Sequence, residues 1–368
     1  MTTNRITFVI SSLTSGGAER VMTTMANHWA TQGKTITLIT MTGNDDAPFY
    51  PLSNQVALVG LGVASESGSP VQALLANANR LRKLRRAIIA SRPDVVISFL
   101  DTANARTLLA TRATGLPVIV AEHTDPNLKQ LHPAWSRLRA LMYPRAARLV
   151  VLSESSKQFF PAAIQHKTVI IPNPVDIAPA QSPIRKSIRP HVVSMGRFGP
   201  EKGFDMLLDA FSMIADRYPD WDLVVWGDGA LRPDLTAQRD ALGLSDRVQF
   251  PGRTSCPHDE LRKAAIYAMS SRREGFPMAL AEAMACGLPA VAFDISSGIR
   301  DILRDQVDGE LVPTGDTHAF ASALGSLMTD EARRAEMAER APEVLDRFGV
   351  ARVMTIWDDL LAHVVREQ

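Results

Sequence analysis

The sequence predicts an α/β protein with two doubly wound domains, each a parallel sheet covered by helices on both faces. Short, almost continuously apolar segments alternate with helical patterns, and this alternation stops and then restarts. The length of 368 residues fits two domains of roughly 150 residues each. Residues 171–190 separate the two sets with five prolines, which end regular structure. Ligands are then expected at the carboxyl ends of the strands.

The first set of strands is expected in the first half of the chain. Its apolar segments are residues 5–10, 34–41, 93–99, 117–123 and 148–154. Helical patterns separate them, as in residues 18–33, where Val21, Met25 and Trp29 recur on one face. Because the strand segments are apolar almost throughout, we expect them to form a parallel sheet that is buried on both faces.

The second set of strands follows the proline-rich segment. Its apolar segments are residues 191–198, 221–229, 247–252, 265–271 and 289–295. The end of the chain has a helical period of apolar residues and is long enough to pack against a domain surface. We therefore predict a first domain at 1–172, a linker at 173–190, a second domain at 191–347 and a C-terminal helix at 348–368 that packs back on the first domain.

The composition argues against several classes of protein. With 46% hydrophobic and 21% charged residues the chain can build globular cores, and its net charge of +1 gives no general attraction to nucleic acid. Cys256 and Cys286 belong to no Cys/His ligand cluster, so neither a disulfide framework nor a structural zinc site is expected. The first apolar run is too short for a secretory signal, and no run approaches the roughly 18 residues of a membrane span. We expect a cytoplasmic protein.

Two glutamates in one apolar helix are the strongest sign of a ligand site. The segment REGFPMALAEAMACGLPAVA contains Glu274 and Glu282, eight positions apart. Pro277 suits the first position of a helix and Gly287 the residue after its end, which predicts a helix at 277–286. A buried carboxylate is costly unless a hydrogen-bond donor satisfies it. Glu282 therefore needs either a protein donor or a ligand.

The start of this helix is also an anion site, because its backbone N–H groups are free and its dipole is positive there. The helix covers roughly 7–8 Å between Pro277 and Glu282. A nucleotide diphosphate sugar has matching parts in the same order: sugar hydroxyls for Glu274, a diphosphate for the helix start and a ribose diol for Glu282. We expect the ribose to satisfy Glu282, which then has no protein partner in the empty site. The alternative is that Glu274 is solvated and Glu282 pairs with an arginine.

The segment EGFPMALAEAMACGLPAV resembles the E-x7-E signature of family 4 retaining glycosyltransferases, which have the GT-B fold. Three further segments are similar to parts of that family: SLTSGGAERV at 12–21 to its first-strand loop, SMGRFGPEKGFDMLLDAF at 194–211 to its G-R-x(4)-K-G segment, and IPNPVD at 171–176 to its interdomain linker. The resemblance covers nearly the whole chain and is greatest to enzymes of bacterial exopolysaccharide and O-antigen assembly. It implies an α/β GT-B fold, with two doubly wound Rossmann-like domains facing a cleft.

The resemblance also implies an activity. It implies a retaining transferase of bacterial surface polysaccharide synthesis that moves a hexose or N-acetylhexosamine from a nucleotide sugar, with uridine as the base. The acceptor is then a growing glycan or a polyprenyl-diphosphate-linked glycan, and no cofactor or metal is needed. The D-x-D match at 220–222 precedes a strand and the acidic pair at 45–46 lies in a polar loop, so neither predicts a metal site.

Three alternatives to this activity stay open. The donor could be GDP-linked, or the chain could be a nucleotide-sugar 2-epimerase on the same fold, which needs no acceptor. It could also be a dinucleotide-binding module, for which WGDGALRPDL at 226–235 offers only part of the glycine motif.

The resemblance assigns residues to the donor site. Gly16 and Gly17 face the donor's diphosphate, His123 lies beside the donor sugar, and Arg197 and Lys202 lie on the diphosphate, where cations stabilise the departing oxygen. The ordinary alternatives are a tight turn for the glycines, a solvated pair for the cations and a structural role for the histidine. The expected catalytic residues are His123, Glu274, Arg197 and Lys202. The expected donor-binding residues are Gly16, Gly17, Arg197, Lys202, Glu274, Gly275, Phe276, Pro277, Met278 and Glu282.

Two basic segments indicate a membrane surface for a lipid-linked acceptor. Residues 79–93 place arginines beside an apolar stripe, and a second basic group follows at 137–148. Basic amphipathic helices can lie on anionic membranes, although a packed helix with a solvated basic face has the same pattern. We expect peripheral contact with the inner face of the membrane. The expected acceptor or membrane side comprises Arg82, Arg85, Arg86, Arg137 and Arg139.

Overall fold

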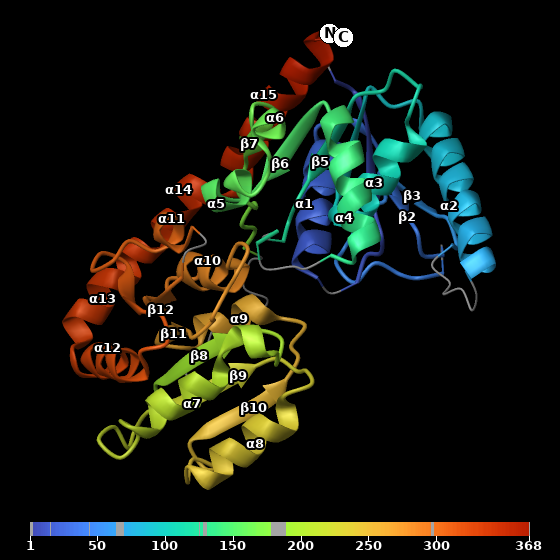
Figure 1. Cartoon of the computed structure of the whole chain (residues 1–368). Coiled ribbons are helices and arrows are strands. Elements are labelled where there is room, and N and C mark those ends of the chain that lie inside the picture. The colour runs from blue at the N-terminus through green and yellow to red at the C-terminus, as the bar shows by residue number, and fades with distance from the viewer. Residues whose placement is uncertain are drawn as a thin grey trace. The chain divides into compact units, whose positions relative to one another are not determined.

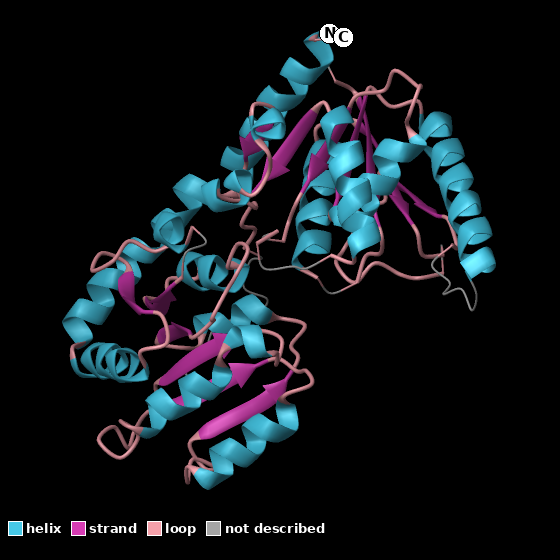
Figure 2. Cartoon of the chain, in the orientation of Figure 1, coloured by secondary structure: helices cyan, strands magenta, loops and turns pink. Residues whose placement is uncertain are grey.

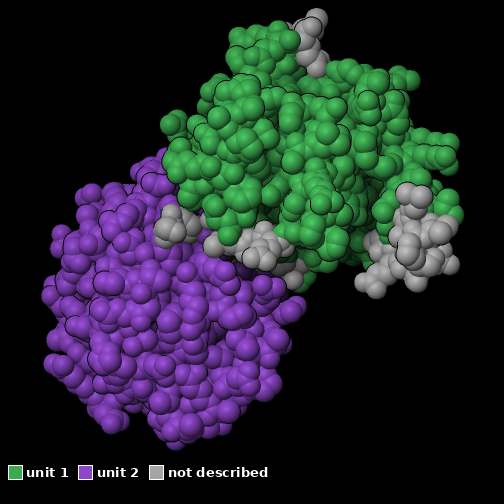
Figure 3. Space-filling view, in the orientation of Figure 1, with its two compact units in different colours: residues 1–174, 350–368 green, residues 175–349 purple. Residues whose placement is uncertain are grey.

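The protein divides into two compact units, shown for a computed structural model in Figures 1, 2 and 3. Unit 1 comprises residues 1–174 and 350–368, and unit 2 comprises residues 175–349 (Figure 3). Most of the expected linker at 173–190 lies outside the described residues. The structure describes residues 3–14, 16–43, 45–63, 70–124, 126–127, 131–177, 189–295 and 298–367.

Unit 1 is built on a seven-stranded parallel sheet in the order β3-β2-β1-β4-β5-β6-β7. The central strand β1 pairs with β2 on one side and β4 on the other, so that Ile6 is opposite Ile36 and Val95. The strands are β1 (Arg5–Ile10), β2 (Thr35–Thr40), β3 (Val56–Gly60), β4 (Val95–Phe99), β5 (Val118–Ala121), β6 (Arg148–Val151) and β7 (Thr168–Ile170).

Helices cover both faces of this sheet (Figure 2). They are α1 (Gly17–Thr31), α2 (Pro70–Ser91), α3 (Asp101–Ala110), α4 (Pro133–Met142), α5 (Glu154–Gln158), α6 (Ala162–Gln165) and α15 (Val350–Arg366), with a 3-10 turn η1 (Tyr143–Arg145). Successive β1 side chains point to opposite faces, so Phe8 joins one core and Val9 the other. The core around Phe8 holds Trp29 of α1 and Trp357 of α15, with their ring centroids 6.4 Å apart. The C-terminal helix α15 thus packs on unit 1.

Unit 2 is built on a six-stranded parallel sheet in the order β10-β9-β8-β11-β12-β13. The strands are β8 (His191–Met195), β9 (Asp222–Trp226), β10 (Val248–Gly252), β11 (Ile266–Met269), β12 (Ala290–Asp294) and β13 (Gly309–Pro313). The helices are α7 (Phe204–Ser212), α8 (Arg232–Ala241), α9 (Pro257–Arg262), α10 (Met278–Ala285), α11 (Ile299–Ile302), α12 (Thr317–Thr329), α13 (Glu331–Arg340) and α14 (Val344–Phe348), with 3-10 turns η2 (Pro200–Lys202) and η3 (Ala341–Glu343).

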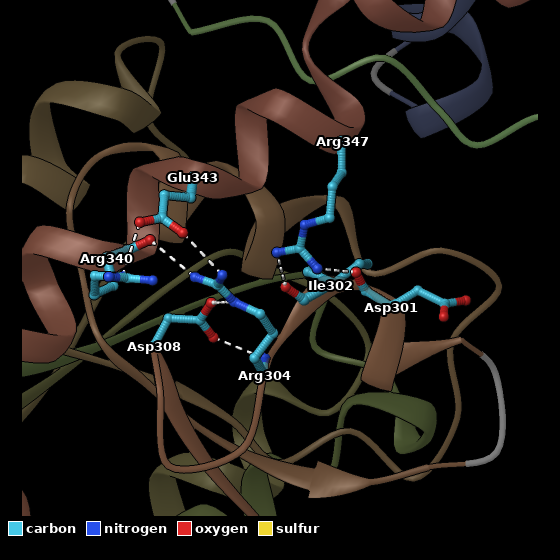
Figure 4. A network of polar contacts seen from close by, with 7 residues as sticks. All are labelled: Asp301, Ile302, Arg304, Asp308, Arg340, Glu343 and Arg347. Atoms are coloured by element: carbon cyan, nitrogen blue, oxygen red, sulfur yellow. Dashed lines mark hydrogen bonds and ion pairs between the residues drawn. The ribbon is translucent and has the colours of Figure 1, made fainter.

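A buried ion pair joins the turn before β13 to the helices that end unit 2 (Figure 4). Asp308 is fully buried and accepts hydrogen bonds from the backbone N–H and the guanidinium Nε of Arg304, at 2.7 and 2.6 Å. The same guanidinium donates to Glu343 at 2.8 Å, and Arg347 donates to backbone carbonyls at the end of α11. A buried carboxylate is tolerated only when it is paired in this way. The network therefore fixes the end of unit 2 just before the chain returns to unit 1.

The predicted fold class is confirmed, and each expected strand contains an observed one. Three strands were missed: β3, β7 and β13. Each is an edge strand of its sheet, with a neighbour on one side only. β7 has only three residues and β13 contains Glu310, whereas β3 is apolar throughout but partly exposed, as an edge strand can be. The predicted helix at 277–286 is present as α10, with Pro277 as its N-cap residue.

Candidate donor site

Two loops of unit 2 meet at the carboxyl edge of its sheet. One loop follows β8 and contains η2, and the other follows β11 and leads into α10. Because β8 and β11 are paired neighbours, with Val192 opposite Ile266, their carboxyl ends lie side by side. Loops at such an edge are where doubly wound sheets bind ligands.

Lys202 and Glu274 form an ion pair between these two loops. The Lys202 Nζ atom lies 2.7 Å from the Glu274 carboxylate, and the two side chains are only 21% and 13% exposed. The Ser271 hydroxyl donates to the same carboxylate oxygen, also at 2.7 Å. Lys202, Glu274 and Pro277 line one small pocket. A cation and a hydrogen-bonded carboxylate thus stand together at the edge where a ligand is expected.

Arg197 lies on the same loop as Lys202 but faces another partner. Its side chain is 74% exposed, and its Nη2 atom lies 2.7 Å from a carboxylate oxygen of Glu201. Partial burial acts to raise the pKa of Glu201, but the hydrogen bond from Arg197, a backbone hydrogen bond and the charges of Arg197 and Lys202 together hold that pKa below its usual value. Arg197 is therefore a solvent-exposed cation on this loop, and it pairs with Glu201 and not with Glu274.

The segment from Gly275 to Met278 connects Glu274 to α10. Phe276 packs against Phe348 with ring centroids 5.5 Å apart, and Pro277 caps the helix, whose first residue is Met278. The aromatic contact and the helix therefore both anchor the backbone that follows Glu274.

Glu282 lies within α10 and is 5% exposed. The expectation that it has no protein partner is wrong, because the His258 Nε2 atom lies 3.7 Å from one of its carboxylate oxygens. His258 belongs to α9 and is equally buried. A histidine is thus a basic group near Glu282 among the described residues, and it gives this buried carboxylate a polar neighbour.

The glycine pair of unit 1 opens α1. Gly16 is the N-cap residue, and a Cβ atom there would come within 2.1 Å of the Glu19 carboxylate, which would have to move. A Cβ atom on Gly17 would meet nothing within 4 Å. The first turn of α1 therefore faces open space at Gly17, which fits the approach of an anion to the helix start.

His123 follows β5, at the carboxyl edge of the sheet of unit 1. Its ring stacks on Phe99 with centroids 3.9 Å apart, and its Nδ1 atom donates to the Asn173 side-chain oxygen at 2.9 Å. The Nε2 atom is buried and has no hydrogen-bond partner among the described residues. Burial lowers the pKa of His123 to about 4, although the Asn173 contact opposes the shift. The imidazole is thus neutral at pH 7 and a weak base.

Sequence reasoning missed three residues that support these groups: Asn173, Ser271 and His258. Asn173 falls inside the IPNPVD segment and Ser271 precedes Glu274 by three positions, so both were visible as polar residues next to expected site positions. His258 had no such signal, because only the packing of α9 against α10 brings it to Glu282.

The five arginines expected on the acceptor or membrane side divide into two groups. Arg85 donates to the carbonyls of Ala110 and Arg112 at 2.7 and 2.8 Å, and Arg139 lies over the rings of two phenylalanines. The other three, Arg82, Arg86 and Arg137, are exposed.

The described residues offer neither a membrane-spanning helix nor a metal site. None of the described helices combines the length and the apolar character that a membrane span requires. No group of three His, Cys, Asp or Glu side chains placed to hold a metal ion was found among these residues. Transfer without a metal stays a prediction.

Comparison with known proteins matches both halves of the chain to families. Residues 15–179 match the family described as glycosyltransferase family 4, and residues 180–344 match the one described as glycosyl transferases group 1. The GalNAc-α-(1→4)-GalNAc-α-(1→3)-diNAcBac-PP-undecaprenol α-1,4-N-acetyl-D-galactosaminyltransferase of Campylobacter jejuni is 28% identical, over 98% of this chain and 99% of its own. The amylovoran biosynthesis glycosyltransferase of Erwinia amylovora is 25% identical, over 94% and 96%.

Solved structures show the same fold. The Anabaena protein HepE, solved in complex with UDP, superposes with a TM-score of 0.77 at 19% identity, over 98% of this chain and 100% of its own. This likeness confirms the GT-B fold.

The buried neutral His123 predicts a pH-dependent stability. Below pH 6.5 the unfolded chain binds a proton at this histidine, whereas the folded protein does not until about pH 4. The free energy of unfolding therefore falls as the pH falls through this window, by up to roughly 1.4 kcal/mol for each pH unit. Urea unfolding at pH 7, 6 and 5 should show a shallower fall for His123→Asn than for the wild type. The exposed His166→Asn should follow the wild type, and parallel curves for all three proteins would contradict the assignment.

Proposed function

This chain belongs to glycosyltransferase family 4, a family of retaining enzymes related to those of bacterial polysaccharide synthesis, and we propose that it transfers a hexose or N-acetylhexosamine from a UDP-sugar. The acceptor is a growing or lipid-linked glycan, and no metal takes part. The observation that carries this proposal is the Lys202–Glu274 ion pair at the carboxyl edge of the second sheet.

The positive charge of Lys202 suits the diphosphate of a nucleotide sugar, and the carboxylate of Glu274 suits its sugar hydroxyls. When the bond to the sugar breaks, the nucleoside diphosphate leaves with negative charge on its departing oxygen, and a cation there lowers the barrier. The Lys202 ammonium supplies this cation, and the Glu274 carboxylate accepts hydrogen bonds from the sugar hydroxyls. The two groups neutralise each other, so neither charge is left half-buried without a partner. Arg197, exposed beside Glu201, adds a second cation on the diphosphate.

One further donor contact is proposed on α10 of unit 2, and unit 1 has two features of its own. Glu282 accepts the ribose hydroxyls, and His258 holds its carboxylate in place. In unit 1, taken by itself, the open space beside Gly17 can admit an anion to the start of α1. The neutral His123 of that unit, whose buried Nε2 atom lacks a partner among the described residues, can accept a hydrogen bond from a hydroxyl group and does not serve as a general base.

The choice of donor and acceptor rests on relatives. HepE was solved with UDP, which supports a uridine nucleotide. The name of the Campylobacter relative includes an undecaprenol-linked glycan, which supports a lipid-linked acceptor. Because such an acceptor resides in a membrane, the protein needs a surface that can approach lipid.

The outer face of α2 suits an anionic membrane. Leu75, Arg82, Arg86 and Ile89 are all exposed and recur at helical spacing on one face of this helix. Arginines bind anionic headgroups while the apolar residues enter the interface. We place the protein in the cytoplasm, in peripheral contact with the inner face of the membrane.

Substitutions in the ion pair test the transfer reaction. Glu274→Gln and Lys202→Met should each lower kcat/KM for transfer from a UDP-sugar by at least about 100-fold, because each removes a charge that acts in the transition state. Lys263 and Glu260 form a matched ion pair at 2.8 Å, just before β11 and so at the opposite end of the same strand. Lys263→Met and Glu260→Gln should therefore keep wild-type rates.

Radiolabelled sugar transfer to a membrane extract measures these rates. Wild-type transfer by both Glu274→Gln and Lys202→Met would refute the site. Conversion of the nucleotide sugar by the protein without any acceptor would favour a 2-epimerase instead.

The membrane surface predicts lipid-dependent sedimentation. The protein should sediment with vesicles that contain anionic lipid and not with neutral vesicles, at low ionic strength. Arg82→Gln together with Arg86→Gln should weaken this binding roughly 30-fold, at about 1 kcal/mol for each arginine. Arg352→Gln, on the exposed face of α15, is the matched control. Equal binding of the double variant and the control would rule out this face.

A further inference from the structure

Arg272, two residues before Glu274, binds the carboxylate of Asp205 through both terminal nitrogens of its guanidinium. Its Nη1 and Nη2 atoms donate to the two carboxylate oxygens of Asp205 at 2.8 and 2.6 Å, and Nη1 also donates to the carbonyl of Pro200 at 3.0 Å. Asp205 lies in the first turn of α7, where the helix dipole favours a carboxylate. Only a planar guanidinium makes a two-pronged contact with a carboxylate and a third bond to a carbonyl.

The backbones of the two loops are in direct contact at the same place. The Arg272 N–H donates to the carbonyl of Glu201 at 2.9 Å, and the Ser270 hydroxyl donates to the carbonyl of Lys202 at 3.1 Å. Gly203 has a φ of +62°, and a Cβ atom there would come within 2.1 Å of the Ser270 carbonyl oxygen. The glycine thus permits an approach that a side chain would prevent. Residues 200–203 and residues 270–272 are therefore two segments in direct contact, which we call the loop contact.

The loop contact sets the distance between the Lys202 ammonium and the Glu274 carboxylate. Lys202 lies on one side of the contact and Glu274 on the other, 72 residues apart in the chain. Both side chains reach the pocket from backbones that the Arg272–Asp205 pair holds together. An ion pair this exposed, with 40% and 42% of the side chains accessible, contributes little to stability. Its effect is on position.

We propose that Arg272 and Asp205 act as a clamp that positions Lys202 and Glu274 for the donor. Arg272 does not touch the substrate in this scheme and is a positioning residue. The inference rests on the proposed function, because it needs Lys202 and Glu274 to bind the donor. The hydrogen bond from Arg272 also keeps the pKa of Asp205 below its usual value, so the clamp stays ionised at neutral pH.

The neighbouring Arg273 provides a matched control. It is exposed on the same loop, and no contact of its side chain appears among those described. Arg272→Gln should lower kcat/KM for the UDP-sugar at least tenfold, while Arg273→Gln leaves it unchanged. Arg272→Lys keeps the charge but loses the two-pronged contact, so it should fall between the wild type and Arg272→Gln. Asp205→Asn should match Arg272→Gln, and the double variant should be no worse than either single variant.

Two further readouts separate positioning from a structural role. The melting temperature of Arg272→Gln should stay close to that of Arg273→Gln. Amide hydrogen exchange of a peptide spanning 270–275 should speed up in Arg272→Gln alone, with or without donor. Loss of activity that merely follows loss of melting temperature would overturn the proposal.

The remaining outcomes are equally decisive. Equal kcat/KM for Arg272→Gln and Arg273→Gln, additive effects of the two clamp substitutions, or unchanged exchange would each overturn the clamp. If the wild type is active and Arg272→Gln has the same kcat/KM, the clamp proposal is wrong and the proposed function stands. A wild type that neither binds UDP nor transfers sugar means that the proposed function fails, and the positioning role fails with it, whatever the exchange shows.

Discussion

The ion pair between Lys202 and Glu274 is the contact on which the candidate site depends. It exists because β8 and β11 run parallel as neighbours and deliver their following loops to the same edge. The close backbone approach at Gly203 then brings the two side chains within 2.7 Å. Each charge satisfies the other, and in the proposed function a nucleotide sugar replaces both contacts with its diphosphate and its hydroxyls.

The central strands of both sheets and the edge strand β10 could be predicted from the sequence, whereas the other three edge strands were missed. Strands such as β4 and β12 are buried on both faces, so their apolar runs are unbroken. The edge strands β3 and β7 have fewer buried residues, and β7 has only three residues in all. The local sequence pattern therefore predicts the central strands of each unit more reliably than the edge strands.

In the candidate site, too, some residues could be predicted from the local sequence and others could not. Lys202 and Glu274 were predicted because each follows a predicted strand within a segment that resembles a known family. Their supporting residues were not, since Asn173 reaches His123 across 50 residues and Arg272 reaches Asp205 across 67. No spacing rule links positions so far apart, and only the folded sheet brings them together. The expectation for Glu282 failed for this reason, because nothing in the sequence of α10 points to a histidine on α9.

Calorimetric titration of UDP, GDP and NAD into the purified protein, without added metal, tests most directly that this edge binds a nucleotide sugar. UDP should bind more tightly than GDP, NAD should not bind, and Lys202→Met should weaken the binding of UDP. If neither UDP nor GDP binds to the wild-type protein, the Lys202–Glu274 pair is an ordinary structural contact and the donor site is not where we place it.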